Sequence, residues 1–482
     1  MKEKNLVKNF LYNISYQLLL ILTPFITTPY ISRVLGADGI GKNSYTLSVA
    51  QVFCIIGTMG ISNYGRRMVA YVRDDKKSLT EMFWGIWSVQ FICGILSVAI
   101  YLIFFVWLNV LGYREIFLIQ TPIVISSILD ISWLYMGVED FKKTVTRNVL
   151  VKISGIVLIF IFVKNQADFK KYIVINSVAT LFGVTTLWIF INEYVTKFKR
   201  IYFKFRKHIR DAFIMLIPIL SVQIYTVLDR TIIGGLSTVT QAGYYDQSQK
   251  LSRIALAIVT SLSTVLMPRI ANMYANKDTE KLEYYLKKSL NLTVATSCLI
   301  TAGIASLSID FVPIFFGEDF KVIIPHSIIT SLLVIFIPLG GVFANQYALP
   351  TGKNKEYTIP LITACIINVL LNFLLAPSLG AFGGVISIVV TEFVTMLLRV
   401  LLVKNYLDIK SLFEGIYVYF IMTFISGGVT ALFAGLLEPS IIAVVLEGFI
   451  CTFIFFLQVL LIKNPLQGDM KSSIRKMFSK FS

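Results

Sequence analysis

Two adjacent charged residues, Asp229 and Arg230, lie well inside the apolar segment 212–236. A charge at the centre of a membrane-spanning helix costs about 2.5–3.5 kcal/mol on insertion scales, so such residues normally face a protein interior and have partners. On a helix, Tyr225 shares a stripe with Asp229, whereas Arg230 points about 100° away from it. We expect these residues to line or gate a cavity, with structural pairing to neighbouring helices as the alternative.

The segment 9–31 carries a polar stripe along an otherwise apolar helix of bilayer length. Polar groups without partners are costly in hydrocarbon, so the stripe must face other protein or water. It predicts either a path through the membrane or polar contacts between packed helices. The candidate cavity residues of this stripe are Asn13, Tyr16, Gln17 and Thr27.

Further cations lie near the ends of the apolar segments. Lys250 and Arg253 are three residues apart on one helical face, and with Arg230 and Arg33 they could form a cationic zone in the outer half of the membrane. Guanidinium groups bind phosphate through paired hydrogen bonds, so such a zone indicates an anionic passenger, for example a pyrophosphate-linked lipid. Extension of the side chains to the membrane surface is the alternative, which we favour for Arg33 and Arg399.

Acidic side chains in the apolar segments are candidates for binding a coupling ion, either H⁺ or Na⁺. They are Asp130, Asp229 and Glu392, and the sequence does not distinguish among them. Asn368 and Asn372 lie one helical turn apart, which hydrogen bonding between helices explains without any ligand.

No catalytic constellation occurs in the sequence. The two histidines are His208 and His326, and no GxSxG, Walker A or HExxH motif is found. The five cysteines lie in apolar segments without CxxC spacing, which predicts small apolar fillers rather than disulfides or a metal site. We therefore expect no enzyme activity, no metal and no cofactor, with energy from an ion gradient or from none.

The elements that position these residues are membrane spans. Of 482 residues, 56% are hydrophobic and 15% charged, which excludes an ordinary soluble enzyme. A span needs about 20 apolar residues, and the chain offers about 14 such segments. The sequence predicts an all-α polytopic membrane protein. The first segment is too long for a signal peptide and lacks a small-residue cleavage site, so we expect it to be retained.

The net charge of +17 reflects membrane topology. With the N-terminus in the cytoplasm, alternating loops place 32 Lys and Arg residues on the cytoplasmic side and seven outside. Both termini are therefore expected in the cytoplasm of a multi-pass cell-membrane protein. A nucleic-acid partner is not expected, because no connection is long enough to hold a folded basic domain.

The two halves of the chain repeat one layout. After the basic stretch 192–211, a proline-containing span, a glycine-containing outer loop and a basic inner loop recur in the order of the first half. We expect a six-helix bundle at 1–191, a cytoplasmic linker at 192–211, a second six-helix bundle at 212–403, and two extra spans with a basic tail at 404–482.

Three stretches resemble the Wzx-type polysaccharide flippases, in the polysaccharide transporter branch of the multidrug/oligosaccharidyl-lipid/polysaccharide (MOP) exporter superfamily. The first is the opening span and turn, with Asn13, Tyr16, Pro24, Thr28, Pro29, Tyr30, Ser32, Arg33, Leu35, Gly36 and Gly41. The second contains Asp229, Arg230, Ile233 and Gly234. The third contains Asn368, Asn372, Pro377, Gly380, Gly383 and Glu392. The resemblance covers most of the chain.

The resemblance implies a MOP/MATE-like fold and a flippase function. The cargo would be an undecaprenyl-pyrophosphate-linked oligosaccharide repeat unit, moved from the cytoplasmic to the outer leaflet by alternating access for capsule, O-antigen or exopolysaccharide synthesis. The partners would be this cargo, membrane lipids, a coupling ion and the polysaccharide polymerase machinery. One alternative is a drug or organic-cation antiporter of the same superfamily, which should have fewer cavity cations. A membrane glycan polymerase or ligase is disfavoured, because the outer loops are too short to hold a catalytic site.

Overall fold

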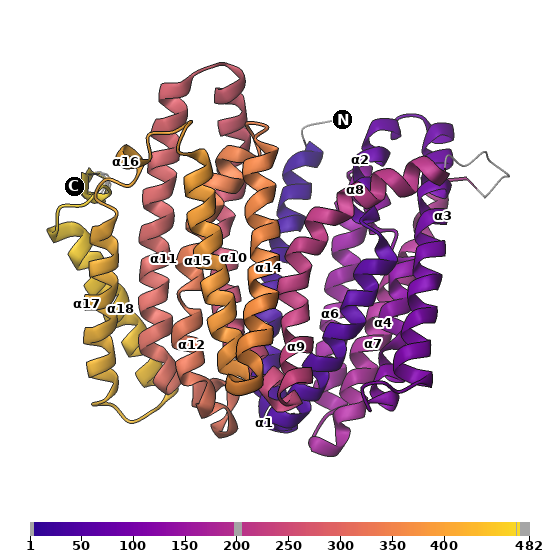
Figure 1. Cartoon of the computed structure of the whole chain (residues 1–482), viewed down its shortest axis with the longest axis horizontal. Coiled ribbons are helices and arrows are strands. Elements are labelled where there is room, and N and C mark those ends of the chain that lie inside the picture. The colour runs from indigo at the N-terminus through magenta and orange to yellow at the C-terminus, as the bar shows by residue number, and fades with distance from the viewer. Residues whose placement is uncertain (1–3, 197–204, 469, 473–482) are drawn as a thin grey trace. The chain divides into compact units, whose positions relative to one another are not determined.

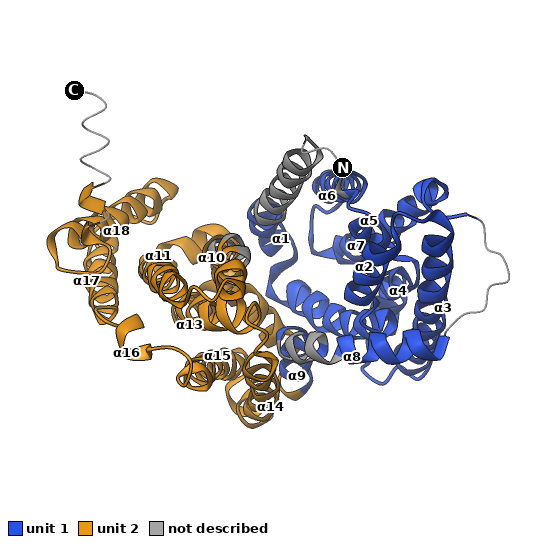
Figure 2. Cartoon of the chain, turned by 90° about the horizontal axis from the view of Figure 1, so that it is seen from above, with its two compact units in different colours: residues 1–235 blue, residues 236–482 orange. Residues whose placement is uncertain are grey.

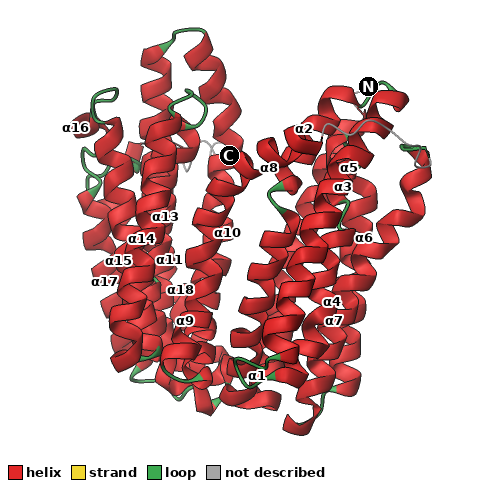
Figure 3. Cartoon of the chain, turned by 45° about the vertical axis from the view of Figure 1, so that its right-hand side comes forward, coloured by secondary structure: helices red, strands yellow, loops and turns green. Residues whose placement is uncertain are grey.

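The computed structural model of the chain describes the backbone of residues 4–196, 205–468 and 470–472. Every regular element in these ranges is helical (Figure 3). Long apolar segments become helices in a membrane because a helix satisfies its own backbone hydrogen bonds, which hydrocarbon cannot do. The prediction of an all-α fold is confirmed.

The chain forms two compact units, residues 1–235 and 236–482 (Figure 2). The α-helices of the first unit (Figure 1) are α1 (Lys4–Thr58), α2 (Ile61–Val72), α3 (Lys76–Tyr101), α4 (Arg114–Leu129), α5 (Ser132–Gly137), α6 (Phe141–Phe162), α7 (Phe169–Thr185), α8 (Phe205–Gln223) and α9 (Asp229–Leu236). Its π-helical segments are η1 (Leu102–Trp107) and η4 (Ile224–Leu228), and its 3₁₀ segments are η2 (Gln166–Asp168) and η3 (Thr186–Glu193).

The second unit contains the remaining helices. They are α10 (Val239–Ala275), α11 (Thr279–Phe316), α12 (Ile324–Thr330), α13 (Leu333–Gly341), α14 (Asn354–Leu379), α15 (Ala381–Val403), α16 (Ile409–Leu412), α17 (Tyr417–Ala434) and α18 (Ile441–Leu461). The 3₁₀ segment η5 (Glu318–Ile323) precedes α12, and the π-helical segment η6 (Val342–Ala348) follows α13.

Eleven helical stretches among the described residues are long and apolar enough to cross a bilayer. One of them, Thr23–Val72, joins two of the predicted spans. The predicted spans 212–236 and 247–268 are also helical, in α8 to α9 and in α10, although they are not among the eleven. Large apolar side chains such as Phe424 and Leu432 are strongly exposed, as expected for surfaces that face lipid. The chain is a multi-pass membrane protein.

A kink divides α1 at Gly36, where φ is 65° and ψ is −178°. Glycine adopts such a positive φ without steric penalty because it has no Cβ. The turn expected after the opening span is therefore a kink within one helical segment.

The first unit has an aromatic core in which α3, α5 and η3 meet. Phe83 stacks on Trp133 with ring centroids 5.3 Å apart, and Trp87 meets Trp188 edge-on at 5.2 Å. Trp84 contacts both Phe83 and Trp87. Such pairs favour offset and edge-on geometries and fix the relative rotation of the helices that carry them.

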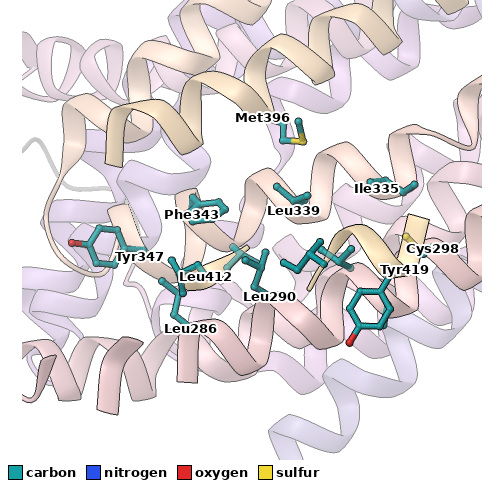
Figure 4. Packing of buried hydrophobic residues seen from close by; sticks show 14 of the residues in the cluster. Leu286, Leu290, Cys298, Ile335, Leu339, Phe343, Tyr347, Met396, Leu412 and Tyr419 are labelled. Atoms are coloured by element: carbon teal, nitrogen blue, oxygen red, sulfur yellow. The ribbon is translucent and has the colours of Figure 1, made fainter. Parts of the chain in front are cut away.

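The core of the second unit draws on helices from its whole length (Figure 4). Leu290 of α11, Leu339 of α13 and Met396 of α15 belong to one buried cluster, as do Tyr419 of α17 and Phe455 of α18. The two C-terminal spans, which have no counterpart in the first half of the sequence, are thus part of this core.

The two compact units divide between Gly235 and Leu236, so α8 and most of α9 group with the first unit. The domains expected from the sequence, at 1–191, 192–211, 212–403 and 404–482, were drawn from membrane spans rather than compactness, and they stay a prediction. Residues 197–204 of the expected linker lie outside the described residues.

Candidate functional site

The candidate site of the first unit is built around Asp229, the first residue of α9. The π-helical segment η4 precedes it and packs against α1. Inserted π-helical turns shift the register of a helix and recur at functional sites. Asp229 is fully buried, and Arg230 beside it is partly buried. A buried carboxyl next to a partly buried guanidinium is the arrangement that the sequence predicted to face the protein interior.

Polar contacts link the second half of α1 to α9 and α4. The hydroxyl groups of Ser48 and Thr231 are 2.6 Å apart, and the Gln120 side chain donates a hydrogen bond to Thr46 at 3.0 Å. Ser48, Thr46 and Gln120 are all buried. Hydrogen-bonded polar pairs of this kind hold membrane helices together, and they fix α9 against α1 immediately after Asp229.

Of the polar stripe at the start of α1, the structure describes only the side chains from residue 23 onward. The Thr27 hydroxyl donates to the Thr23 carbonyl oxygen at 2.9 Å, which is a contact within the helix. The side chains of Asn13, Tyr16, Gln17 and Tyr225 lie outside the described side chains. Their assignment to a cavity stays a prediction.

The predicted cations of the second unit lie on α10. Arg253 is exposed and donates to the Gln249 side-chain oxygen at 2.9 Å and 3.2 Å, and Lys250 is partly buried. The buried face of the same helix carries Ser252, whose hydroxyl donates to the carbonyl oxygen of Thr330 on α12 at 2.9 Å. Arg33 and Arg230 belong to the first unit, so a shared cationic zone stays a prediction.

Asp130 has a structural contact that the sequence did not predict. It ends α4 in an extended conformation, and its carboxylate accepts a hydrogen bond from the Ser132 backbone N–H at 2.9 Å. The Asp130 carbonyl oxygen accepts a hydrogen bond from Gln90, whose side-chain oxygen in turn accepts one from the Trp133 indole. This network shapes the break between α4 and α5, and a coupling role for Asp130 stays a prediction.

Glu392 and the two asparagines lie on consecutive helices of the second unit. Glu392 is buried on α15. On α14 the Asn372 amide donates to the backbone oxygen of Asn368 at 3.0 Å and to its side-chain oxygen at 3.2 Å, and both residues are fully buried. The asparagines therefore contact each other along one helix, and the hydrogen bonding between helices that the sequence predicted for them stays a prediction.

A buried acid pair was missed by sequence reasoning. Glu447 of α18 is fully buried, Asp310 of α11 is 5% exposed, and their carboxyl groups are within hydrogen-bonding reach of each other. Neither Glu447 oxygen receives a hydrogen bond from a donor among the described residues. The signal was present in the sequence, because Glu447 is the sole charged residue of α18.

Among the described residues, long apolar helices with exposed apolar side chains and buried ionisable residues on the spans are features of multi-pass membrane transporters. Residues 6–274, more than half of the chain, match the family described as "Polysaccharide biosynthesis protein". The chain belongs to this polysaccharide biosynthesis protein family.

Relatives and solved structures agree with this family. A protein of Escherichia coli (strain K12) named "Putative O-antigen transporter" is 24% identical over 80% of this chain and 93% of its own length. A Shigella dysenteriae protein of the same name is 21% identical over 80% of this chain and 96% of its own length.

Among solved structures, the lipid II flippase MurJ in an inward closed conformation matches with a TM-score of 0.73 and 17% identity, over 94% of this chain and 98% of its own. A multidrug resistance MATE transporter of the MOP superfamily, outward-facing, matches with a TM-score of 0.52 and 15% identity, over 83% of this chain and 96% of its own. The MOP-like fold and the resemblance to Wzx-type polysaccharide flippases are confirmed.

Proposed function

We propose that this protein moves an undecaprenyl-pyrophosphate-linked oligosaccharide repeat unit from the cytoplasmic to the outer leaflet of the cell membrane. The observation that carries the proposal is the combination of relatives named as O-antigen transporters along four-fifths of the chain with the fold of a lipid II flippase along almost all of it. The product would supply capsule, O-antigen or exopolysaccharide synthesis, and the polymerase machinery would act on it afterwards.

The chemistry of the chain supports this cargo. A sugar head group needs polar surroundings on its way through the membrane, whereas a polyprenyl tail can stay in hydrocarbon. Buried polar side chains occur along α1, α4, α10 and α15. Arginine binds pyrophosphate oxygens well, which gives Arg230 a role in holding the charged link between sugar and lipid.

Alternating access and ion coupling complete the proposal. Two repeated halves favour a mechanism in which one half moves against the other around a fixed site. Asp229 and Glu392 are both buried acids, and with Asp130 they are the candidates to take up H⁺ or Na⁺. The excess of Lys and Arg in alternate loops supports cytoplasmic termini.

The proposal is tested by measuring lipid-linked oligosaccharide in each membrane leaflet, together with surface polysaccharide, in cells lacking this protein. We expect the lipid-linked unit to accumulate in the cytoplasmic leaflet while surface polymer is lost, and the wild-type chain to restore both. Normal leaflet distribution and normal surface polymer would overturn the proposal and direct attention to export of organic cations.

The same cells test Arg230. Arg230→Ala should fail to restore surface polymer at normal expression, whereas Arg269→Ala, at an exposed arginine of α10, should restore it. Arg230→Lys should restore it only in part, because a lysine keeps the charge but not the paired hydrogen bonds. Full rescue by Arg230→Ala would remove Arg230 from the mechanism.

A further inference from the structure

A cavity of about 630 Å³ opens on the first unit among α6, α7 and η3. We call it the α6 groove. Its lining changes character along α6, from Lys142, Thr146 and Arg147 near the start of the helix to Leu150, Val151 and Ser154 further along. From Lys142 to Ser154 the helix rises about 18 Å, so the groove has a polar end and an apolar end that are well separated.

The polar end lies where a membrane span begins, because the span on α6 runs from Lys142 to Phe162. At this end, Lys143 already interacts with side chains of the protein. Its ammonium group pairs with Glu193, lies 3.4 Å from the Asp140 carboxylate and sits 4.7 Å from the centre of the Tyr194 ring. These contacts hold Lys143 in place and offset one of the two carboxylate charges at the polar end.

Two further cations remain at the polar end. Lys142 is exposed and forms no ion pair with the described residues. Arg147 is partly buried, and its guanidinium donates hydrogen bonds to the Gly183 carbonyl oxygen at 3.3 Å and to the side-chain oxygen of Asn148, which are both uncharged partners. Three cations therefore stand against two carboxylates at this end. A site at the membrane surface with this balance attracts an anion.

The start of α6 adds to this attraction. The preceding residue, Asp140, makes no capping hydrogen bond from its side chain, because its carboxylate contacts Lys143 and the Tyr194 hydroxyl. By contrast, the carboxylate of Asp75 caps α3 by accepting hydrogen bonds from two backbone N–H groups. The N–H groups of a helix start left without a cap favour a negatively charged partner.

The apolar end is shaped for a hydrocarbon chain. Leu150, Phe182 and Ile189 line the groove and are each more than 60% exposed. They come from α6, α7 and η3, so they form the sides of one channel rather than a ridge on one helix. A water-soluble anion would gain nothing from these contacts.

We propose that the α6 groove binds an anionic phospholipid, with its phosphate at Lys142 and the start of α6 and an acyl chain along Leu150 and Ile189. The occupant must be anionic, because of the excess cations, and must carry an acyl chain, because of the apolar end. This proposal does not depend on the proposed flippase function.

The test uses the purified full chain in phosphatidylcholine bilayers with increasing phosphatidylglycerol. Lipids that stay bound are counted by native mass spectrometry. The wild-type chain should retain phosphatidylglycerol in preference to phosphatidylcholine. Lys142→Glu should weaken this retention roughly fivefold or more, the effect expected for loss of a basic residue at an anionic surface.

A matched control and a steric variant sharpen the result. Lys77→Glu changes an exposed lysine at the second position of α3, a helix whose start is already capped, and it should leave retention unchanged. Ser154→Trp should block the apolar end and reduce retention without altering charge. The proposal fails if Lys142→Glu and Ser154→Trp both retain phosphatidylglycerol normally, or if Lys77→Glu loses it equally.

A final arm adds a polyprenyl pyrophosphate to the wild-type chain. If this lipid displaces phosphatidylglycerol from the groove at far lower concentration, the groove belongs to the cargo lipid and the phospholipid assignment is overturned. If it does not compete, the phospholipid assignment stands.

Discussion

At the scale of single residues, the acid pair Asp310 and Glu447 has the sharpest consequences. Two carboxyl groups in contact can hydrogen-bond only if one of them supplies the proton. Two unprotonated carboxylates would repel each other in surroundings of low dielectric constant. The pair therefore joins α11 to α18 only while it holds a proton.

Substitutions that keep or remove a donor should separate these cases. Glu447→Gln supplies amide N–H groups to the Asp310 carboxylate and should change the free energy of unfolding by less than about 1 kcal/mol. Glu447→Leu leaves Asp310 buried without a partner and should lower it by about 1–3 kcal/mol. Thermal unfolding of the purified chain measures both, with the exposed Glu438→Leu as the control. Equal stability of the Gln and Leu variants would contradict the shared proton.

The sequence predicted some of these residues and not others, for a physical reason. Asp229 and Arg230 were noticed because two adjacent charges inside an apolar segment are rare. Asp310 lies near the end of α11, and Glu447 is the one charged residue of α18. In the sequence, each therefore resembles a side chain that extends to the membrane surface. Their contact depends on the packing of α18 on α11, which no local pattern encodes.

At the scale of elements, α1 and α9 meet through a glycine. A Cβ atom added at Gly234 would lie 2.3 Å from the Tyr45 ring, whereas one added at the next residue, Gly235, would lie 3.7 Å from the Tyr45 hydroxyl. The close approach therefore depends on Gly234 alone, and it brings α9 close enough for the contact between Ser48 and Thr231.

Gly234→Ala should therefore separate α9 from α1. We expect a loss of about 1–3 kcal/mol of stability, as for other overpacked sites, while Gly235→Ala should be neutral or slightly stabilising because alanine favours helix. Thermal unfolding of the two variants side by side gives the comparison. Similar melting temperatures for both would show that the contact has room to relax.

The kink in α1 makes a second prediction at this scale. At Gly36 an alanine would be forced into a positive φ with an extended ψ, a backbone conformation that is essentially restricted to glycine and costs roughly 1–3 kcal/mol. Gly36→Ala should lower the melting temperature, whereas Gly155→Ala, in the interior of α6 with no atom near the added Cβ, should not. If Gly36→Ala is as stable as the wild type, the bend at this residue is not required.

The start of α3 should respond to pH. Hydrogen bonds from the Ser78 hydroxyl and from the Ser78 and Lys77 backbone N–H groups lower the pKa of Asp75. A lowered folded-state pKa means that the cap stabilises the helix at neutral pH and that this contribution is lost as pH falls through that value. Hydrogen exchange in the first turn of α3 should therefore lose protection in acid. Asp75→Ser should keep its protection across the range.

The sequence predicted which segments form helices, but it did not predict where those helices kink or become π-helical. Hydropathy gave the spans because a bilayer requires long apolar helices. The glycines of the sequence indicated a turn after the opening span. The position of the kink at Gly36 and the π-helical geometry of η4 depend on packing against neighbouring helices, so the sequence did not predict them.

At the scale of the whole molecule, the C-terminal helices α17 and α18 are held to the rest of the second unit by polar as well as apolar contacts. In a bilayer, lipid can replace apolar neighbours at little cost, but it cannot replace a partner for a buried carboxyl. The resemblance to a known superfamily predicted the fold of the chain. The contact of a buried carboxyl on α11 with one on α18 could be found only in the structure.

Ending the chain after Lys404 should thus destabilise the second unit mainly through Asp310. We expect lower yield and a lower melting temperature for the shortened chain in lipid bilayers, and partial recovery when Asp310→Leu is added. If Asp310→Leu brings no recovery, loss of the apolar core dominates.

The position of the aromatic core also determines which part of the molecule intrinsic tryptophan fluorescence monitors. All five tryptophans of the chain precede residue 189 and thus belong to the first unit, and four of them meet in or beside that core. Tryptophan fluorescence therefore comes from the first unit, and the second unit has no tryptophan of its own to monitor. One tryptophan placed there would give each half of the molecule its own optical signal.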